Sequence, residues 1–238
     1  ISSERVDISK MSSSEWVALL EHPNAWHREH AQRLLVQSQS KSEIPSLKKL
    51  IRESDDQVAI ISALWTLEGL EEFDANLLKE QMVSNHSEVI IAALGVMRSA
   101  LDSGKEIKGA LAILKAVDAK NEVLAIPLIR TLVSLNQTEA FGDILNVFNG
   151  HSKHKFIVPV TFSAFKDQDE SFVSYLEDSK EGQAMLGKLK PYLRKKPKKA
   201  AKLSASDKKM YDHGKKLFLG EAACFGCHGQ EGQGMPMM

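Results

Sequence analysis

The chain has 238 residues but only two cysteines, which stand three positions apart with a histidine directly after the second: Cys224, Cys227 and His228. Two thiols at this spacing can form thioether bonds to both vinyl groups of one haem from a single helical turn. The adjoining imidazole can then reach the iron as its proximal ligand. The pattern therefore predicts one covalent haem c, with the two cysteines as anchors and His228 as the axial ligand of the iron.

Other chemistries of a cysteine pair remain alternatives. A structural zinc ion needs four ligands, and the nearest second pair of donors, His151 and His154, lies far upstream of the cysteines. A thioredoxin-like dithiol expects a βαβ context, and the sequence shows no strand pattern. A disulfide or two free thiols would fit an oxidising compartment. The histidine and the glycine-rich turn that follow the pair favour haem over these readings.

Charge and hydropathy limit the possible partners. Lys plus Arg and Asp plus Glu both number 31, so the net charge gives no reason to expect nucleic acid. No apolar run approaches the roughly 18 residues of a membrane helix. No nucleophile elbow, P-loop or metalloprotease helix occurs, so no catalytic residue is assigned. Because the chain begins at Ile1, we expect it to be a piece of a longer protein, whose signal peptide lies outside it.

The elements expected before this motif are all helices. Ser12 with Glu15, and Asp167 with Glu170, have the spacing of a capping box at a helix start. Pro127 lies inside another helical pattern and is expected to bend it. Two stripes at helical spacing predict helices with one buried face, namely Val89, Ala92, Ala93, Val96 and Met97 in one and Ala125, Leu128, Ile129, Leu132 and Val133 in the other.

These helices recur at intervals of about 31 to 34 residues, a period typical of helical repeats. Four similar strings align at His27, Val58, Val89 and Val123, and a weaker fifth begins near Phe156. Shorter amphipathic segments separate them, at residues 44–51, 77–83, 107–114 and 141–148. A repeating helix pair of this length resembles HEAT repeats, in which each pair buries its apolar stripe by stacking on its neighbours. Residues 1–187 are therefore predicted to form a HEAT-like α-solenoid.

A basic strip follows the repeats. It begins at Lys188, ends at Lys202, and carries eight Lys or Arg and two Pro but no acidic residue. Proline and like-charge repulsion both oppose compact packing, so residues 188–203 are predicted to be a solvated linker. The alternative is a docking strip for an acidic redox partner or an anionic surface.

Residues 204–238 resemble the N-terminal helix and haem loop of class I cytochrome c domains. The resemblance implies that Gly214 and Phe218 are helix-packing positions and that the C-x-x-C-H residues hold the haem. In that class the distal methionine comes much later in the chain, so no axial role is assigned to Met235, Met237 or Met238. The matching positions are Gly214, Leu217, Phe218, Cys224, Cys227, His228, Gly232 and Gly234.

Residues 19–37 and 63–70 look like the HEAT region of the large haem-binding CxxCH proteins of the PVC type. In that family a propeller-shaped dehydrogenase domain precedes the repeats and a cytochrome c domain follows them. The resemblance implies electron transfer within a larger periplasmic or otherwise extracytoplasmic oxidoreductase, with a redox protein or an upstream dehydrogenase domain as partner. The chain departs from the family at His27, where a second tryptophan is usual.

Two other classes of function compete with electron transfer. The repeats could be a protein-interaction scaffold with an appended haem domain, or the chain could be part of a dehydrogenase whose catalytic propeller lies upstream. The remaining candidate residues point to packing. Trp16, Trp26 and Trp65 are expected to pack on apolar helix faces. A cluster of His22, His27 and His30 lacks the carboxylate or cysteine pattern that would complete a metal site.

Overall fold

The computed structural model describes residues 7–165, 169–189 and 204–220. Every regular element within these ranges is a helix, which confirms the prediction of an all-α protein. The chain divides into two units, residues 1–193 and 194–238, and each is considered by itself. No helix in the described ranges combines the length and the apolar character needed to cross a membrane.

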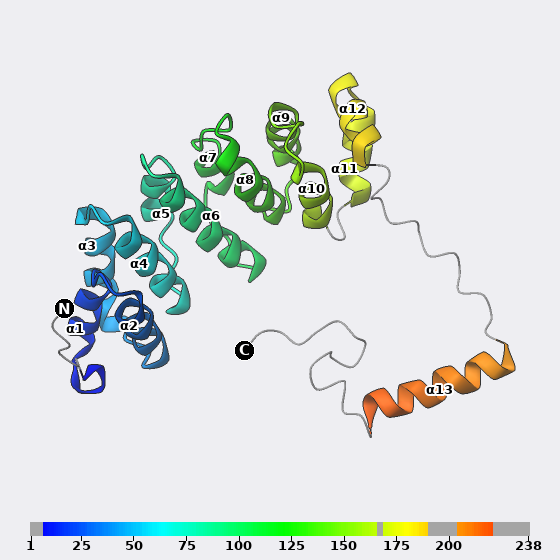
Figure 1. Ribbon diagram of the computed structural model, residues 1–238. Coiled ribbons are helices and arrows are strands. Elements are labelled where there is room, and N and C mark those ends of the chain that lie inside the picture. The colour runs from blue at the N-terminus through cyan, green and yellow to red at the C-terminus, as the bar shows by residue number, and fades with distance from the viewer. Residues whose placement is uncertain (1–6, 166–168, 190–203, 221–238) are drawn as a thin grey trace. The chain divides into compact units, whose positions relative to one another are not determined.

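From α1 to α8 the helices of the first unit alternate between shorter and longer elements (Figure 1). Their bounds are η1 (Ile8–Lys10), α1 (Ser13–Leu19), α2 (Ala25–Gln37), η2 (Lys41–Glu43), α3 (Ile44–Glu53), α4 (Gln57–Gly69), α5 (Ala75–Gln81), α6 (Ser87–Asp102), α7 (Ala110–Leu114), α8 (Glu122–Ser134), η3 (Thr138–Ala140), α9 (Phe141–Gly150), α10 (Ile157–Phe165), α11 (Asp169–Glu177) and α12 (Lys180–Leu189). All four predicted shorter segments contain a helix. The third starts late, at α7, because Gly109 before it has a left-handed φ of 73°.

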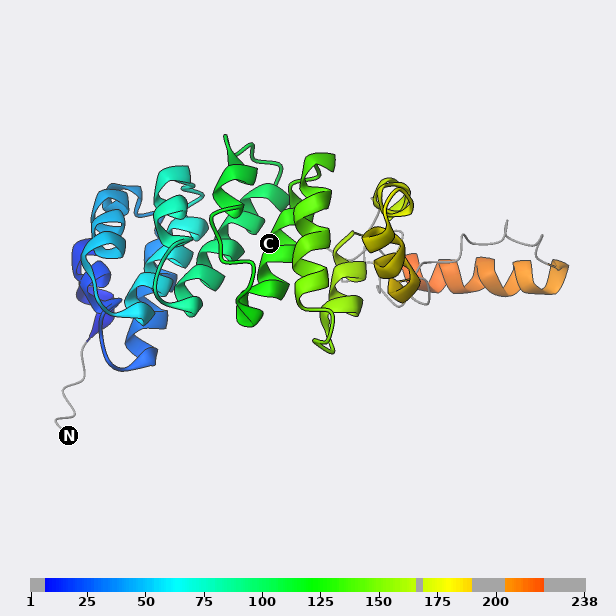
Figure 2. The same cartoon turned by 90° about the horizontal axis from the view of Figure 1, so that it is seen from above.

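Neighbouring helices in this unit pack in a regular succession. Helices α2, α4, α6, α8 and α10 contact one another in chain order, and each of α1, α3, α5 and α7 packs on the helix that follows it. The succession can be followed in Figure 2. Each pair therefore buries its apolar side against the pairs before and after it.

Three of the longer helices begin with the same capping device. The side chains of Asn24, Asp56 and Asn121 accept a hydrogen bond from the backbone N–H two residues further on, at 3.0, 2.8 and 3.0 Å. Such caps satisfy a donor that the first helical turn leaves free. About two turns after each cap comes a buried position, occupied by Ala31, Ala63 and Leu128.

This shared cap sets the register of the repeats. The residues that donate to the three caps are Trp26, Val58 and Val123. Trp26 rather than His27 is therefore equivalent to Val58. The first repeat is therefore offset by one residue from the alignment that the sequence predicts. The third repeat is offset as well, since Val89 is the third residue of α6 whereas Val58 is the second residue of α4.

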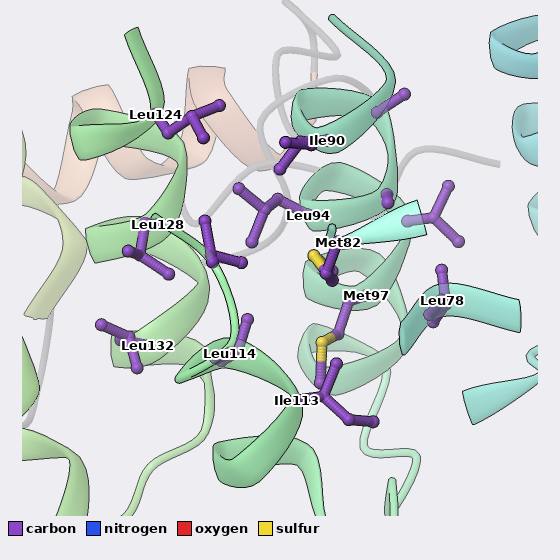
Figure 3. Packing of buried hydrophobic residues seen from close by; sticks show 14 of the residues in the cluster. Leu78, Met82, Ile90, Leu94, Met97, Ile113, Leu114, Leu124, Leu128 and Leu132 are labelled. Atoms are coloured by element: carbon purple, nitrogen blue, oxygen red, sulfur yellow. The ribbon is translucent and has the colours of Figure 1, made fainter. Parts of the chain in front are cut away.

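Both apolar stripes predicted from the sequence are buried. Every residue of the two sets is at most 4% exposed. Figure 3 shows how this core is assembled from four consecutive helices, with labelled side chains from the end of α5 and from α6, α7 and α8 pointing toward one another. Helix α8 runs through Pro127 without a break, and the bend expected there stays a prediction.

The end of the first unit differs from the predicted linker boundary. Helix α12 extends to Leu189, which is 3% exposed, and it packs on α9 and α10. Lys188 and Leu189 are therefore helical residues of this unit. An aromatic cluster joins α9, α10 and α11, in which the Phe165 and Phe172 rings stack with centroids 4.0 Å apart and Phe141 meets Phe172 edge-on at 5.1 Å.

The described part of the second unit is one helix, α13 (Ala205–Leu219). Its N-cap is Ser204, whose hydroxyl accepts a hydrogen bond from the Asp207 backbone N–H at 3.2 Å. The predicted Ser12–Glu15 capping box at the other end of the protein is also present. The corresponding pair Asp167–Glu170 cannot be compared, because Asp167 lies outside the described residues.

Candidate functional site

The predicted haem ligands Cys224, Cys227 and His228 lie outside the described residues, as do the methionines near the end of the chain. The described residue nearest to them in sequence is Gly220, which follows the last residue of α13. What the structure describes of this candidate site is therefore the helix that leads into it.

Helix α13 has one apolar and one charged face. Helical spacing places Met210, Gly214, Leu217 and Phe218 on one side. None of the residues of α13 is buried, and Met210 is 70% exposed. A Cβ atom added to Gly214 would meet no atom within 4 Å. Lysines and an aspartate occupy the opposite side: Lys208, Lys209, Asp212, Lys215 and Lys216.

The histidine cluster of the first unit is an aromatic arrangement at the start of α2. The His22 and His27 ring centroids are 4.2 Å apart, and the Trp26 ring stacks on His30 at 3.9 Å. Burial and the neighbouring histidines lower the pKa of His27, whose buried Nδ1 has no hydrogen-bond partner. Within the described ranges no three His, Cys, Asp or Glu side chains gather in a way that could hold a metal ion.

The second histidine pair has other contacts. Nε2 of His151 lies 2.9 Å from the carbonyl oxygen of Ala119, and Nδ1 of His154 accepts a hydrogen bond from the backbone N–H of Phe156 at 3.2 Å. Each imidazole therefore has a local structural partner. The zinc alternative would also need the cysteines, which lie beyond the described residues.

The tryptophan prediction is correct for two of the three residues. Trp16 packs on the core and donates its Nε1–H to the carbonyl oxygen of Ile8 at 3.0 Å. Trp65 packs on the core beside Gly95, where an added Cβ would stand 2.9 Å from the Trp65 ring. For Trp26 the prediction is wrong, because this side chain is 51% exposed. It occupies the second position of its helix, which faces solvent in the other capped repeats as well.

A charged pocket that the sequence analysis missed lies between α6, α8 and α10. Its volume is about 370 Å³. Arg98 from α6 and Arg130 from α8 line it, and burial followed by repulsion from Arg130 lowers the pKa of Arg98. The other lining residues are Leu101, Asp102, Val133, Ser134, Asn136, Ser163, Ala164 and Phe165. No local spacing pattern links the two arginines, since they meet only through helix packing.

No family model, curated protein or solved structure matches this chain. The proposed function therefore rests on the motifs and resemblances of the sequence and on the geometry of the described residues.

Proposed function

We propose that this chain transfers electrons through one covalent haem c, anchored by Cys224 and Cys227 and ligated by His228. The observation that carries the proposal is the placement of the only two cysteines, at the vinyl-bridging spacing and directly before a histidine. Haem iron cycles between the ferrous and ferric states, and the protein tunes its potential through axial ligation and burial.

The helix before the motif supports this proposal. Helix α13 ends shortly before Cys224, and its apolar side is uncovered among the described residues. An apolar helix face is stable in water only when something covers it. A haem and the remainder of a class I cytochrome c domain would cover the side that carries Gly214 and Phe218, as the resemblance of this segment implies.

In the same proposal the first unit is a HEAT-like α-solenoid that serves as the scaffold. The chain-order packing of α2, α4, α6, α8 and α10 supports it, and so does the cap shared by Asn24, Asp56 and Asn121. In a repeat array each unit contacts mainly its neighbours, and stability arises from the interfaces between units. Attachment of haem c would place the protein in the periplasm or another extracytoplasmic compartment, within a larger oxidoreductase of the PVC type.

The test is to produce the chain in cells with active cytochrome c maturation and look for haem that stays on the denatured polypeptide. After acid-acetone extraction, the pyridine haemochrome spectrum should show one haem per chain. Cys224→Ala with Cys227→Ala should abolish it. The control His86→Ala removes an exposed imidazole that makes no capping bond and should leave it unchanged.

Two results would contradict the proposal. One is a wild-type chain without covalent haem under conditions where a control cytochrome is loaded. The other is stoichiometric zinc that disappears in the double cysteine variant, which would support the structural zinc alternative.

A further inference from the structure

The pocket between α6, α8 and α10 holds two cations and one carboxylate, that of Asp102, which offsets their charge only in part. Arg98 is half-buried and Arg130 exposed, and both line the same hollow. Within residues 7–165, 169–189 and 204–220, neither forms an ion pair or a hydrogen bond through its guanidinium group. Like charges in a partly dehydrated site repel each other and oppose folding. The arrangement gains stability when an anion binds between them.

The lining of the pocket suits an acidic side chain, in which a carboxylate is attached to apolar carbon atoms. Guanidinium groups pair with carboxylates through two parallel N–H···O bonds. The side-chain amide of Asn136 supplies a further donor, while Leu101 and Phe165 provide apolar wall. The hydroxyls of Ser134 and Ser163 also line the pocket but already donate to the carbonyl oxygens of Arg130 and Val160. A pocket of about 370 Å³ accommodates a side chain of this kind with room for its backbone.

The hollow continues beyond the two arginines. A second pocket, of about 410 Å³, shares Leu101, Ser134 and Asn136 with the first and extends to Lys105 and Lys108. A third, of about 270 Å³, shares those two lysines and reaches α5. This line of hollows is longer than a small anion needs, and it fits an extended chain.

Charge along this line is mixed: basic side chains outnumber acidic ones in the first two hollows, whereas Glu71, Glu72 and Glu106 outnumber the two lysines in the third. Lys105 donates to the carbonyl oxygen of Glu71 at 3.0 Å and lies over the Phe73 ring at 4.1 Å. Asp102 and Glu106 also line the hollows and partly offset the cations. The two arginines therefore form the end at which an acidic group is held most strongly.

From this geometry we infer that the first two hollows bind an acidic segment of a partner protein, with Arg98 and Arg130 pairing with one of its carboxylates. The occupant is a peptide rather than a free anion because the hollows continue past the arginines. The inference concerns the first unit alone, so it stands or falls independently of the haem. The proposed binding site is also different from the basic strip at residues 188–202.

An oligoglutamate peptide labelled with fluorescein is the probe, and its polarisation with the full chain measures binding. Arg98→Gln with Arg130→Gln should weaken binding by about tenfold or more, and added salt should weaken wild-type binding. The control Arg33→Gln removes an exposed arginine of α2 and should change the affinity by less than about twofold. Asp102→Asn should tighten binding, because it removes a competing carboxylate.

A second measurement locates the peptide. Phenylglyoxal modifies accessible arginines, and mass spectrometry reads each site separately. Bound oligoglutamate should protect Arg98 and Arg130 and leave Arg33 unprotected. Protection of Arg194 alone would place the peptide on the basic strip and overturn the inference. Equal binding of oligoglutamate by the double variant and the wild type would also overturn it, as would protection by inorganic phosphate but not by the peptide.

Discussion

The buried hydroxyl of Thr131 on α8 lies 3.1 Å from the carbonyl oxygen of Leu94 on α6, and it is also 3.0 Å from the carbonyl oxygen of Pro127 in its own helix. One hydroxyl proton is shared between these two acceptors. The contact ties neighbouring longer helices together at a point where the surrounding core is otherwise apolar.

Replacing Thr131 with Val should lower the free energy of unfolding by about 1 kcal/mol, because it removes this bond while keeping the volume. Urea denaturation followed by circular dichroism measures the change. Thr131→Ser should retain the bond because it keeps the hydroxyl, but it loses a buried methyl group. A valine variant as stable as the wild type would show that the bond contributes nothing.

Ala93→Asp should destabilise the first unit strongly. Ala93 is fully buried in α6, so the variant buries an unpaired carboxylate at a cost of about 3 kcal/mol or more. The matched control is Val123→Asp, at a position that is 59% exposed near the start of α8. In thermal denaturation Ala93→Asp should melt at a clearly lower temperature than Val123→Asp. Similar melting temperatures for the two variants would contradict the burial of Ala93.

Two glycines should respond in opposite directions to alanine. A Cβ at Gly95 would stand 2.9 Å from the Trp65 ring, so Gly95→Ala forces the ring to move and should lower the melting temperature. At Gly187 in α12 an added Cβ meets nothing within 4 Å. Gly187→Ala should therefore stabilise by about 0.5–1 kcal/mol through helix propensity. If both substitutions changed the stability in the same direction, the space around the two glycines would not determine the effect.

The ion pair between Lys48 and Asp74 predicts a pH dependence. Lys48 Nζ lies 2.9 Å from Asp74, and this contact lowers the pKa of Asp74 below its ordinary value of 3.8. A lowered folded-state pKa contributes stability above the unfolded-state value and loses it as pH falls through the folded-state value. Asp74→Asn should therefore cost stability at neutral pH, and the difference from wild type should shrink below about pH 4.

Urea titrations at several pH values measure that difference, with Glu53→Gln as control. Glu53 makes only an exposed pair with Lys49 at 3.8 Å and should contribute little at any pH. A constant difference between wild type and Asp74→Asn from neutral pH to below pH 4 would rule out the ion pair as its cause.

The uncovered side of α13 gives a prediction for the haem-loaded chain. Phe218→Asp places a charge on the side of α13 that the haem and the rest of its domain would cover, and it should lower the temperature at which the Soret band changes. Lys216→Asp makes the same residue on the opposite side of the helix and should have a much smaller effect. Equal effects would argue that the apolar side has no packing role.

The sequence by itself determined the features that depend on neighbours along the chain. The spacing of Val89, Ala93 and Met97 placed them on one side of α6, and the structure buries all three. Ser12 with Glu15 marked a helix start for the same reason, since a cap acts within one turn. The spacing of Cys224, Cys227 and His228 likewise predicts haem attachment, although these residues lie beyond the described part of the chain.

Only the tertiary structure decided what covers each helix face. Tryptophan is commonly a core residue, yet the position of Trp26 next to the Asn24 cap leaves its side chain exposed to solvent. Arg98 and Arg130 belong to different helices, and the packing of α6 on α8 brings them to one pocket. Helical periodicity specifies which side chains share a face. Whether that face meets a neighbour or water depends on contacts between segments distant in sequence, which local spacing does not encode.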